Sequence, residues 1–174
     1  MEELQRLTVV KFRRPEIKRA FLFACYTGLR FSDLRNLTWK QICLNGTRHK
    51  LEFRQKKTGS FEYFPLSKTA SKILTNGHGN LIHMPDAKVF KLPDRNNYNE
   101  DLKVLAKKEG IDKNITSHTG RHTFATLMLT KGVDIYTVSK LLGHKSLSTT
   151  QIYAKIIDQK KDEAVDMLPQ IDVQ

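Results

Sequence analysis

The chain has 174 residues, of which 39% are hydrophobic, and a formal net charge of +12 at neutral pH. This length supports one folded domain with a real core, and the apolar content excludes an intrinsically disordered chain. The positive charge favours a polyanionic partner, with nucleic acid ahead of an acidic membrane surface.

The first predicted element is a helix. Pro15 suits a first helical position, and the densely apolar segment that follows it stops at Gly28. Ser32 is expected to cap a second, short helix over 32–37.

The residue pattern then changes to that of strands. Segments 38–44, 47–55 and 61–66 predict three strands, which are separated by Asn45-Gly46 and by a turn at 57–59. We expect them to form a small antiparallel meander.

Helical patterns return after the sheet, and Asp134 is a candidate N-cap among them. Because the predicted sheet is small and helices surround it, the fold class is α+β, mainly α. These later helices are expected over 67–74, 100–110, 117–132, 134–143, 147–155 and 156–168.

The cysteines and the hydropathy indicate the cellular compartment. Cys25 and Cys43 are too far apart for a C-x-x-C pair and are typical of reduced, buried thiols. No apolar run approaches the roughly 20 residues of a membrane span, and no signal peptide opens the chain. We therefore expect a cytoplasmic protein with no membrane partner.

Two cations follow predicted turns. Arg30 comes just after the stop at Gly28, where it can point into a cleft, although a surface ion pair with Asp33 is the simpler alternative. Lys57 lies in the turn between the second and third strands, where an ammonium could protonate a charged leaving group. An ordinary solvated lysine, or Lys56 in the same role, remains an alternative.

The segment SHTGRHTF places His118 and Arg121 one helical turn apart, on one face and in the first turn of a helix. Free backbone N–H groups and the helix dipole favour an anion there. Arg121 offers a planar fork for phosphate, and His118 titrates near neutral pH. His122 points elsewhere and is interpreted as structural.

The segment LLGHKSLSTTQIYAK places a helix break between a histidine and a tyrosine. Gly143 ends one helix and lets His144 face outward, while Ser146 or Ser148 can cap the next helix, which carries Tyr153. A tyrosine at this spacing is usually core or half-buried surface.

Together these side chains suit metal-free phosphoryl transfer. Fixed arginine and histidine donors stabilise the charge that develops on a phosphodiester under attack. A tyrosine nucleophile would store the bond energy covalently. Since a phenol with a pKa of about 10 is only about one part in a thousand ionised at pH 7, it needs nearby cations and a base.

Four segments resemble the motifs of one family, the tyrosine recombinases (integrases of phages and mobile elements). In chain order they are TGLRFSDLRNLTW, RQKKTGSFEYFPL, SHTGRHTFATLML and LLGHKSLSTTQIYAK, and they span Thr27 to Tyr153. The resemblance implies a helical catalytic domain over 1–174. It also implies an N-terminal core-binding domain, which we expect to be absent from this chain.

The resemblance assigns phosphate binding to three residues. Arg30 and Arg121 would clamp the scissile phosphate, and His144 would donate a further hydrogen bond to it. Asp33 falls where the family often has an acidic residue that orients these side chains.

The resemblance assigns the chemical steps to three others. Tyr153 would attack the phosphate and form a 3′-phosphotyrosyl link, His118 would act as acid and base, and Lys57 would protonate the departing 5′-hydroxyl. No metal, nucleotide cofactor or small-molecule substrate is implied.

The implied partners are double-stranded DNA and further copies of the chain. We expect a tetramer on DNA, a monomer alone as one option, and a terminal helix over about 156–168 that can dock on a neighbouring protomer. Basic groups in 11–19 and 48–57 would contact phosphates, which predicts strong salt sensitivity.

Three alternatives remain. A type IB topoisomerase shares this chemistry but rejoins the same strand, so exchange between two duplexes separates it from a recombinase. A non-catalytic DNA-binding module could keep the fold. A zinc protein is disfavoured because the sequence has no HExxH and no paired Cys/His spacing.

Overall fold

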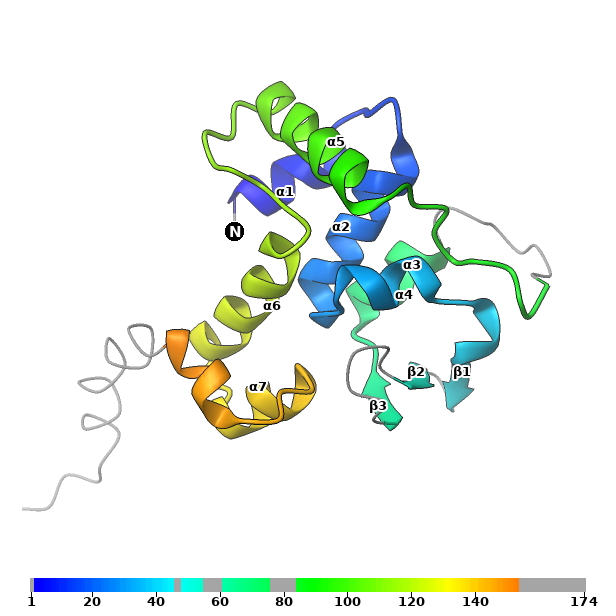
Figure 1. The fold of residues 1–174 in the computed structure, drawn as a ribbon, viewed down its shortest axis with the longest axis vertical. Helices are drawn as coiled ribbons and strands as arrows, with labels where there is room; N and C mark the ends of the chain where they lie inside the picture. Colours follow the sequence, from blue (N-terminus) through cyan, green and yellow to red (C-terminus); the bar gives the residue numbers. More distant parts are fainter. Residues whose placement is uncertain (1, 46–47, 55–60, 76–83, 154–174) are drawn as a thin grey trace, which may run out of the picture. The chain divides into compact units, whose positions relative to one another are not determined.

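The computed structural model describes residues 2–45, 48–54, 61–75 and 84–153 (Figure 1). Lys57 and the predicted terminal helix over 156–168 lie outside the described residues. The chain divides into two compact units, which are described separately below: residues 1–124 and residues 125–174.

The first unit contains most of the helices and the sheet. Its elements are α1 (Glu2–Val9), α2 (Pro15–Thr27), α3 (Phe31–Asn36), the 3₁₀ turn η1 (Trp39–Gln41), β1 (Ile42–Asn45), β2 (Arg48–Arg54), β3 (Phe61–Pro65), α4 (Lys68–Thr75) and α5 (Arg95–Lys108). Helix α6 (Thr119–Thr130) starts in this unit and continues into the second.

The second unit contains α7 (Ile135–Leu141) and the 3₁₀ turns η2 (Leu147–Thr149) and η3 (Gln151–Tyr153). The chain is thus mostly helical with one small antiparallel sheet, and the predicted fold class is confirmed.

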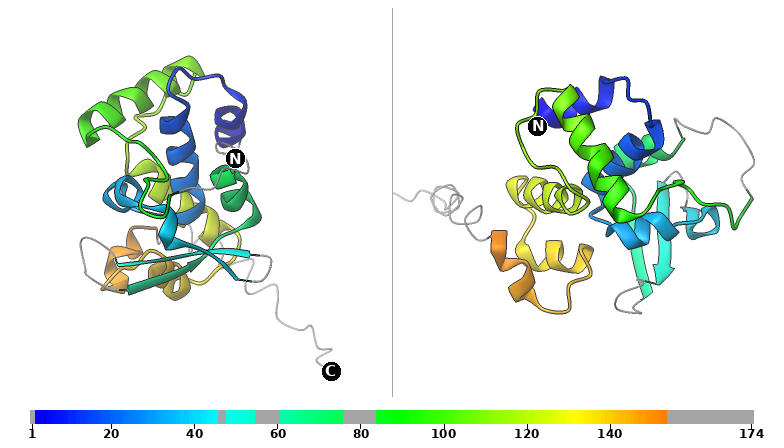
Figure 2. Two further views of the ribbon diagram at one scale, coloured as in Figure 1. Left: turned by 90° about the vertical axis from the view of Figure 1, so that its right-hand side faces the viewer. Right: turned by 45° about the horizontal axis from the view of Figure 1, so that its top comes forward.

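Helix α2 forms the centre of the first unit and packs against α1, α4 and α5 (Figures 1 and 2). Its apolar side chains are buried around most of its circumference, which is expected of a helix with neighbours on several sides. Phe23 is fully buried, and its ring lies 5.4 Å from that of Phe90. The helix begins at Pro15 and ends before Gly28, as predicted.

The sheet has the order β1-β2-β3 with antiparallel pairing, as predicted. Leu51 lies opposite Ile42 and Phe64, and Leu51 and Phe64 are buried. Because strand residues alternate between faces, Lys50 and Tyr63 lie on the other face, where the Lys50 ammonium sits 5.3 Å from the Tyr63 ring centroid. Such alternation of side chains indicates strands in the sequence.

Several boundaries differ from the prediction. Helix α1 is not among the predicted elements, and only Leu4 and Leu7 are buried on it. Ser32 lies inside α3, whose N-cap position is Arg30. Segment 39–41 forms a 3₁₀ turn, so the first strand starts only at Ile42.

Helix α5 starts five residues before the predicted start. The Asp94 carboxylate accepts hydrogen bonds from the backbone N–H groups of Asn96 and Asn97, so the helix begins at Arg95. The asparagine-rich first turn has little apolar periodicity, which explains why its sequence does not indicate a helix.

Helix α7 starts and ends as its sequence predicts. Asp134 caps it by accepting a hydrogen bond from the Thr137 backbone N–H at 2.9 Å. At the other end Gly143 adopts a left-handed conformation with φ of 59°, and the N–H groups of Gly143 and His144 bond to carbonyls of Lys140 and Ser139. This pair of bonds is the Schellman motif, which glycine favours.

The predicted helix over 147–155 forms two separate 3₁₀ turns, η2 and η3, within the described residues. Ser146 caps the first by accepting a hydrogen bond from the Ser148 N–H at 3.3 Å. Across the described ranges, no helix is long and apolar enough to cross a membrane.

Candidate active site

The backbone around Arg30 is fixed by the turn between α2 and α3. Gly28 takes a left-handed φ of 67°, and its N–H bonds to the Ala24 carbonyl at 2.8 Å. The Arg30 carbonyl then accepts bonds from the N–H groups of Asp33 and Leu34 at the start of α3. Arg30 is half-buried and Asp33 is buried, so this turn supports a guanidinium at a partly screened position.

Helix α6 approaches α2 closely at its first turn. A Cβ added at Gly120 would lie 2.8 Å from the Ala24 Cβ, a distance that real Cβ atoms essentially never show. The absence of a side chain at Gly120 therefore permits this contact between the two backbones.

The close approach places Arg121 beside the end of α2. Its Nη1 donates a hydrogen bond of 2.6 Å to the Gly28 carbonyl, across 93 residues of sequence. The segment that contains Arg30 and the segment that contains Arg121 are therefore in direct contact.

His118 lies immediately before α6 and is exposed. Its carbonyl accepts the His122 N–H at 3.0 Å, so His118 occupies the N-cap position rather than a place in the first turn. The sequence suggests a structural role for His122, but this residue is exposed as well.

In the second unit, Thr150 connects His144 with Tyr153. The Thr150 hydroxyl lies 2.8 Å from Nδ1 of His144, and its carbonyl accepts the Tyr153 N–H at 3.1 Å. Thr150 is fully buried and Tyr153 is 7% exposed, whereas His144 is half-buried. The sequence does not indicate the role of Thr150, because nothing in a run of polar residues shows that this hydroxyl contacts the His144 ring.

The predicted site residues thus fall into two groups. Arg30, His118 and Arg121 belong to the first unit, and His144 and Tyr153 belong to the second. Sequence reasoning also missed Asn99, which contacts the segment before α6.

The two cysteines differ in burial. Burial raises the pKa of the Cys25 thiol to about 12, which keeps it protonated and unreactive, as predicted for a structural cysteine. Cys43 is only half-buried. In the part of the chain that the structure describes, no group of three or more His, Cys, Asp or Glu side chains could hold a metal ion.

Several cations of segment 11–19 have partners inside the fold. Arg13 and Arg14 bind the buried Asp101 carboxylate at 3.5 Å and 2.6 Å. Lys18 donates to carbonyls at the end of α1, and partial burial lowers its pKa. These cations therefore hold α1 and α5 to α2. The sequence predicted that the basic groups of 11–19 contact phosphates, and it did not indicate this structural role.

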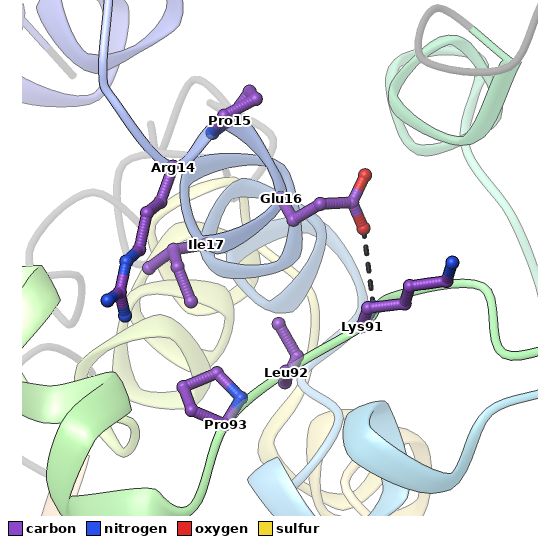
Figure 3. A pocket seen from close by; sticks show the side chains of 7 residues that line it. All are labelled: Arg14, Pro15, Glu16, Ile17, Lys91, Leu92 and Pro93. Atoms are coloured by element: carbon purple, nitrogen blue, oxygen red, sulfur yellow. Dashed lines mark hydrogen bonds between the residues drawn. The ribbon is translucent and has the colours of Figure 1, made fainter.

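A hollow of about 490 Å³ lies at the start of α2 (Figure 3). Glu16 at its edge accepts the Lys91 backbone N–H and pairs with Arg19. Since α2 has 13 residues, about 20 Å separates this hollow from the Arg30 turn at its other end. The residues that line it are Arg14, Pro15, Glu16, Ile17, Lys91, Leu92 and Pro93.

Residues 7–160 match the phage integrase family, and the chain therefore belongs to this family. It is 32% identical over 173 residues to a tyrosine recombinase of Pseudothermotoga lettingae, covering 97% of this chain and 59% of the relative. It is 37% identical over 158 residues to the tyrosine recombinase XerA of Saccharolobus solfataricus, covering 90% and 52%. The chain thus spans between half and three-fifths of the length of these relatives.

Solved structures show the same fold. The catalytic domain of bacteriophage HP1 integrase superposes with a TM-score of 0.67 at 22% identity, covering 97% of this chain and 92% of that one. A post-cleavage complex of the XerH site-specific recombinase with a palindromic difH substrate gives a TM-score of 0.70 at 19% identity, covering 95% of this chain and 50% of that one.

Proposed function

We propose that this chain carries the catalytic machinery of a site-specific DNA recombinase, which cleaves and rejoins strands through a 3′-phosphotyrosyl intermediate. The observation that carries the proposal is the 2.6 Å bond from Arg121 to the Gly28 carbonyl. It unites the two arginine-bearing segments in one place, and two guanidinium forks are suited to one phosphodiester.

In this proposal Arg30, Arg121 and His144 bind the non-bridging oxygens of the scissile phosphate. Their donors stabilise the charge of the transition state in a preorganised arrangement, so that no metal is needed for that task. The bond to Gly28 holds the Arg121 guanidinium in place before DNA arrives, which lowers the entropic cost of binding the transition state.

Tyr153 supplies the attacking oxygen, His118 acts as acid and base, and Lys57 protonates the departing 5′-hydroxyl. Since Tyr153 is only 7% exposed, its side chain must become more accessible before it can attack. The segment after Gly143, with its short 3₁₀ turns, is the part that we propose rearranges.

We also propose double-stranded DNA as the partner and self-association into a tetramer on it, with the segment 156–168 docking on a neighbouring protomer. The relatives are named as recombinases, and the structurally similar Tn1549 transposon integrase is described as being in complex with circular intermediate DNA. A DNA substrate implies that the protein acts where the DNA is held, which we take to be the cytoplasm.

Strand transfer between two duplexes tests this function. The chain is incubated at low salt with a supercoiled plasmid and labelled linear fragments that cover the plasmid sequence. We expect label joined covalently to the plasmid, and we expect Tyr153→Phe, which keeps the ring, to abolish the joining.

The same assay separates the alternatives. Plasmid relaxation without transfer of label would favour topoisomerase-like rejoining of one strand. Plasmid binding with neither relaxation nor transfer would favour a non-catalytic DNA-binding module.

A further inference from the structure

A side chain of α5 holds the residue before His118. Oδ1 of Asn99 accepts a 2.8 Å hydrogen bond from the Ser117 backbone N–H, across 18 residues of sequence. Ser117 is 7% exposed and Asn99 is half-buried. A buried N–H that lost this acceptor would have to find another one or shift toward water.

Asn99 is itself well anchored in α5. The neighbouring side chains of Tyr98 and Leu102 are almost completely buried, and the helix is capped at Asp94. The amide oxygen of Asn99 therefore lies on a rigid helix, and a rigid element is needed to hold a functional group in a fixed position.

Local hydrogen bonds fix the backbone of His118 between Ser117 and α6. The His118 N–H donates to the Thr116 hydroxyl at 3.3 Å, and its carbonyl accepts the His122 N–H. The Thr116 N–H in turn donates to the Thr119 hydroxyl at 2.9 Å. These bonds are local to 116–122, and the Asn99 bond ties this short network to α5.

We propose that Asn99 is a positioning residue for His118: it fixes the backbone from which the imidazole reaches the reacting groups. The inference rests on the proposed function, because it assigns Asn99 a role in the reaction of that same site. Asn99 acts through Ser117 and does not itself touch the substrate.

Two substitutions test the role of the acceptor oxygen. Asn99→Leu has a similar size and removes the acceptor, whereas Asn99→Asp keeps an oxygen where Ser117 needs it. Asp94→Ala is the matched control, because it weakens the cap of the same helix and leaves the Ser117 bond in place.

The first measurement requires no DNA. Hydrogen exchange of the Ser117 amide, followed by NMR, should quicken in Asn99→Leu and stay close to wild type in Asn99→Asp and Asp94→Ala. The His118 ring resonances should shift in Asn99→Leu alone. If Asn99→Leu leaves the Ser117 exchange and the His118 ring unchanged, the positioning role is wrong, whatever the chain does to DNA.

The second measurement separates binding from chemistry. At saturating DNA, the rate of covalent adduct formation should fall about tenfold to a hundredfold in Asn99→Leu, as expected when a reacting group is displaced. Asn99→Asp should recover most of that rate, and the DNA dissociation constant of Asn99→Leu should be unchanged.

The outcomes for the two proposals are distinct. If the wild-type chain forms no adduct, the proposed function fails, and the NMR result still decides whether Asn99 positions His118. If wild type forms the adduct and Asn99→Leu forms it equally fast, or if Asn99→Asp is as slow as Asn99→Leu, the role of Asn99 in the reaction is contradicted.

Discussion

At the scale of single residues, Thr150 holds the imidazole of His144 at one ring nitrogen. Its buried hydroxyl lies 2.8 Å from the imidazole Nδ1. A ring held at one nitrogen has a defined orientation, and a hydrogen-bond donor must be aimed at the place where charge develops.

Thr150→Val should therefore slow DNA cleavage about tenfold or more with little change in DNA affinity, because valine has the same shape and offers no hydroxyl. Thr150→Ser keeps the hydroxyl and should stay within a few-fold of wild type. Single-turnover cleavage at saturating DNA measures both variants. Equal rates for Thr150→Val and wild type would show that this bond does not matter to the reaction.

Arg121 lies at the start of α6, and its guanidinium is held by the hydrogen bond to the Gly28 carbonyl. Arg121→Lys keeps the charge and loses the planar fork, so it cannot bond to the Gly28 carbonyl and to a phosphate in the same way. We expect the cleavage rate to fall on the order of 10²–10³, the loss seen when one transition-state donor is removed. A rate within threefold of wild type would mean that charge alone suffices.

At the scale of secondary-structure elements, the contact between α2 and α6 depends on Gly120. Gly120→Ala would place a Cβ 2.8 Å from the Ala24 Cβ, which is bonded directly to the backbone of α2 and cannot rotate away. We expect the free energy of unfolding to fall by about 1–3 kcal/mol, as in other overpacked cores, and cleavage to fall with it.

A compensating pair isolates that contact. Ala24→Gly removes the atom that clashes, so the double variant Ala24→Gly/Gly120→Ala should lose less stability than the sum of the two single variants. Urea unfolding of all four proteins gives the coupling free energy. Additive losses would show that the two helices do not meet in the way described.

The cap of α5 predicts a dependence of stability on pH. Hydrogen bonds from the Asn97 backbone and side chain hold the pKa of the Asp94 carboxyl below its ordinary value. Its contribution to stability is thus present above the unfolded pKa and is lost as pH falls through the lower folded pKa. Asp94→Asn can still cap the helix but does not titrate.

The difference in Tm between wild type and Asp94→Asn should therefore change between about pH 5 and pH 2, with wild type losing stability faster as the pH falls. Thermal unfolding monitored by circular dichroism across this range measures it. Parallel Tm curves would contradict the role of the charged cap.

At the scale of the whole molecule, part of the charge of +12 stabilises the fold itself. The largely exposed side chains of Arg13 and Arg14 bind the buried Asp101 carboxylate. The proposed binding of DNA would use the remaining positive charge through phosphate contacts, and we expect that binding to weaken steeply with salt.

Arg14→Gln should consequently lower stability by about 1–3 kcal/mol, because it leaves a buried carboxylate without its nearer partner. It should change the salt dependence of DNA binding little. Arg35→Gln removes the same charge from an exposed side chain and should leave stability within about 0.5 kcal/mol of wild type. If Arg14→Gln is as stable as Arg35→Gln and binds DNA less well, the charge of Arg14 serves the DNA instead.

What the sequence predicts well are features encoded by neighbouring residues. Gly28 and Gly143 end helices because few other residues adopt a left-handed conformation there, and the strands show alternating side chains. The order of the four motifs indicated the family, and the motifs contain the candidate site residues. The Arg121–Gly28 bond agrees with the expectation that the first and third motifs lie together.

The sequence does not predict features that depend on contacts between residues far apart in the chain. Asn99 lies in a run of polar residues, and its role is visible only once α5 lies beside the Ser117 backbone. The segment 147–153 has helical spacing but forms two 3₁₀ turns within the described residues. Propensity alone does not distinguish these short elements from one continuous helix.

The phosphotyrosyl mechanism requires that Tyr153 is the residue that becomes covalently linked to DNA. Wild-type chain and Tyr153→Phe are incubated with supercoiled plasmid at low salt and digested with nuclease, and their peptides are examined by mass spectrometry. Under this mechanism we expect a nucleotide attached through its 3′-phosphate to Tyr153 in wild type and no adduct in Tyr153→Phe. An adduct on any other residue, or one that persists in Tyr153→Phe, would contradict it.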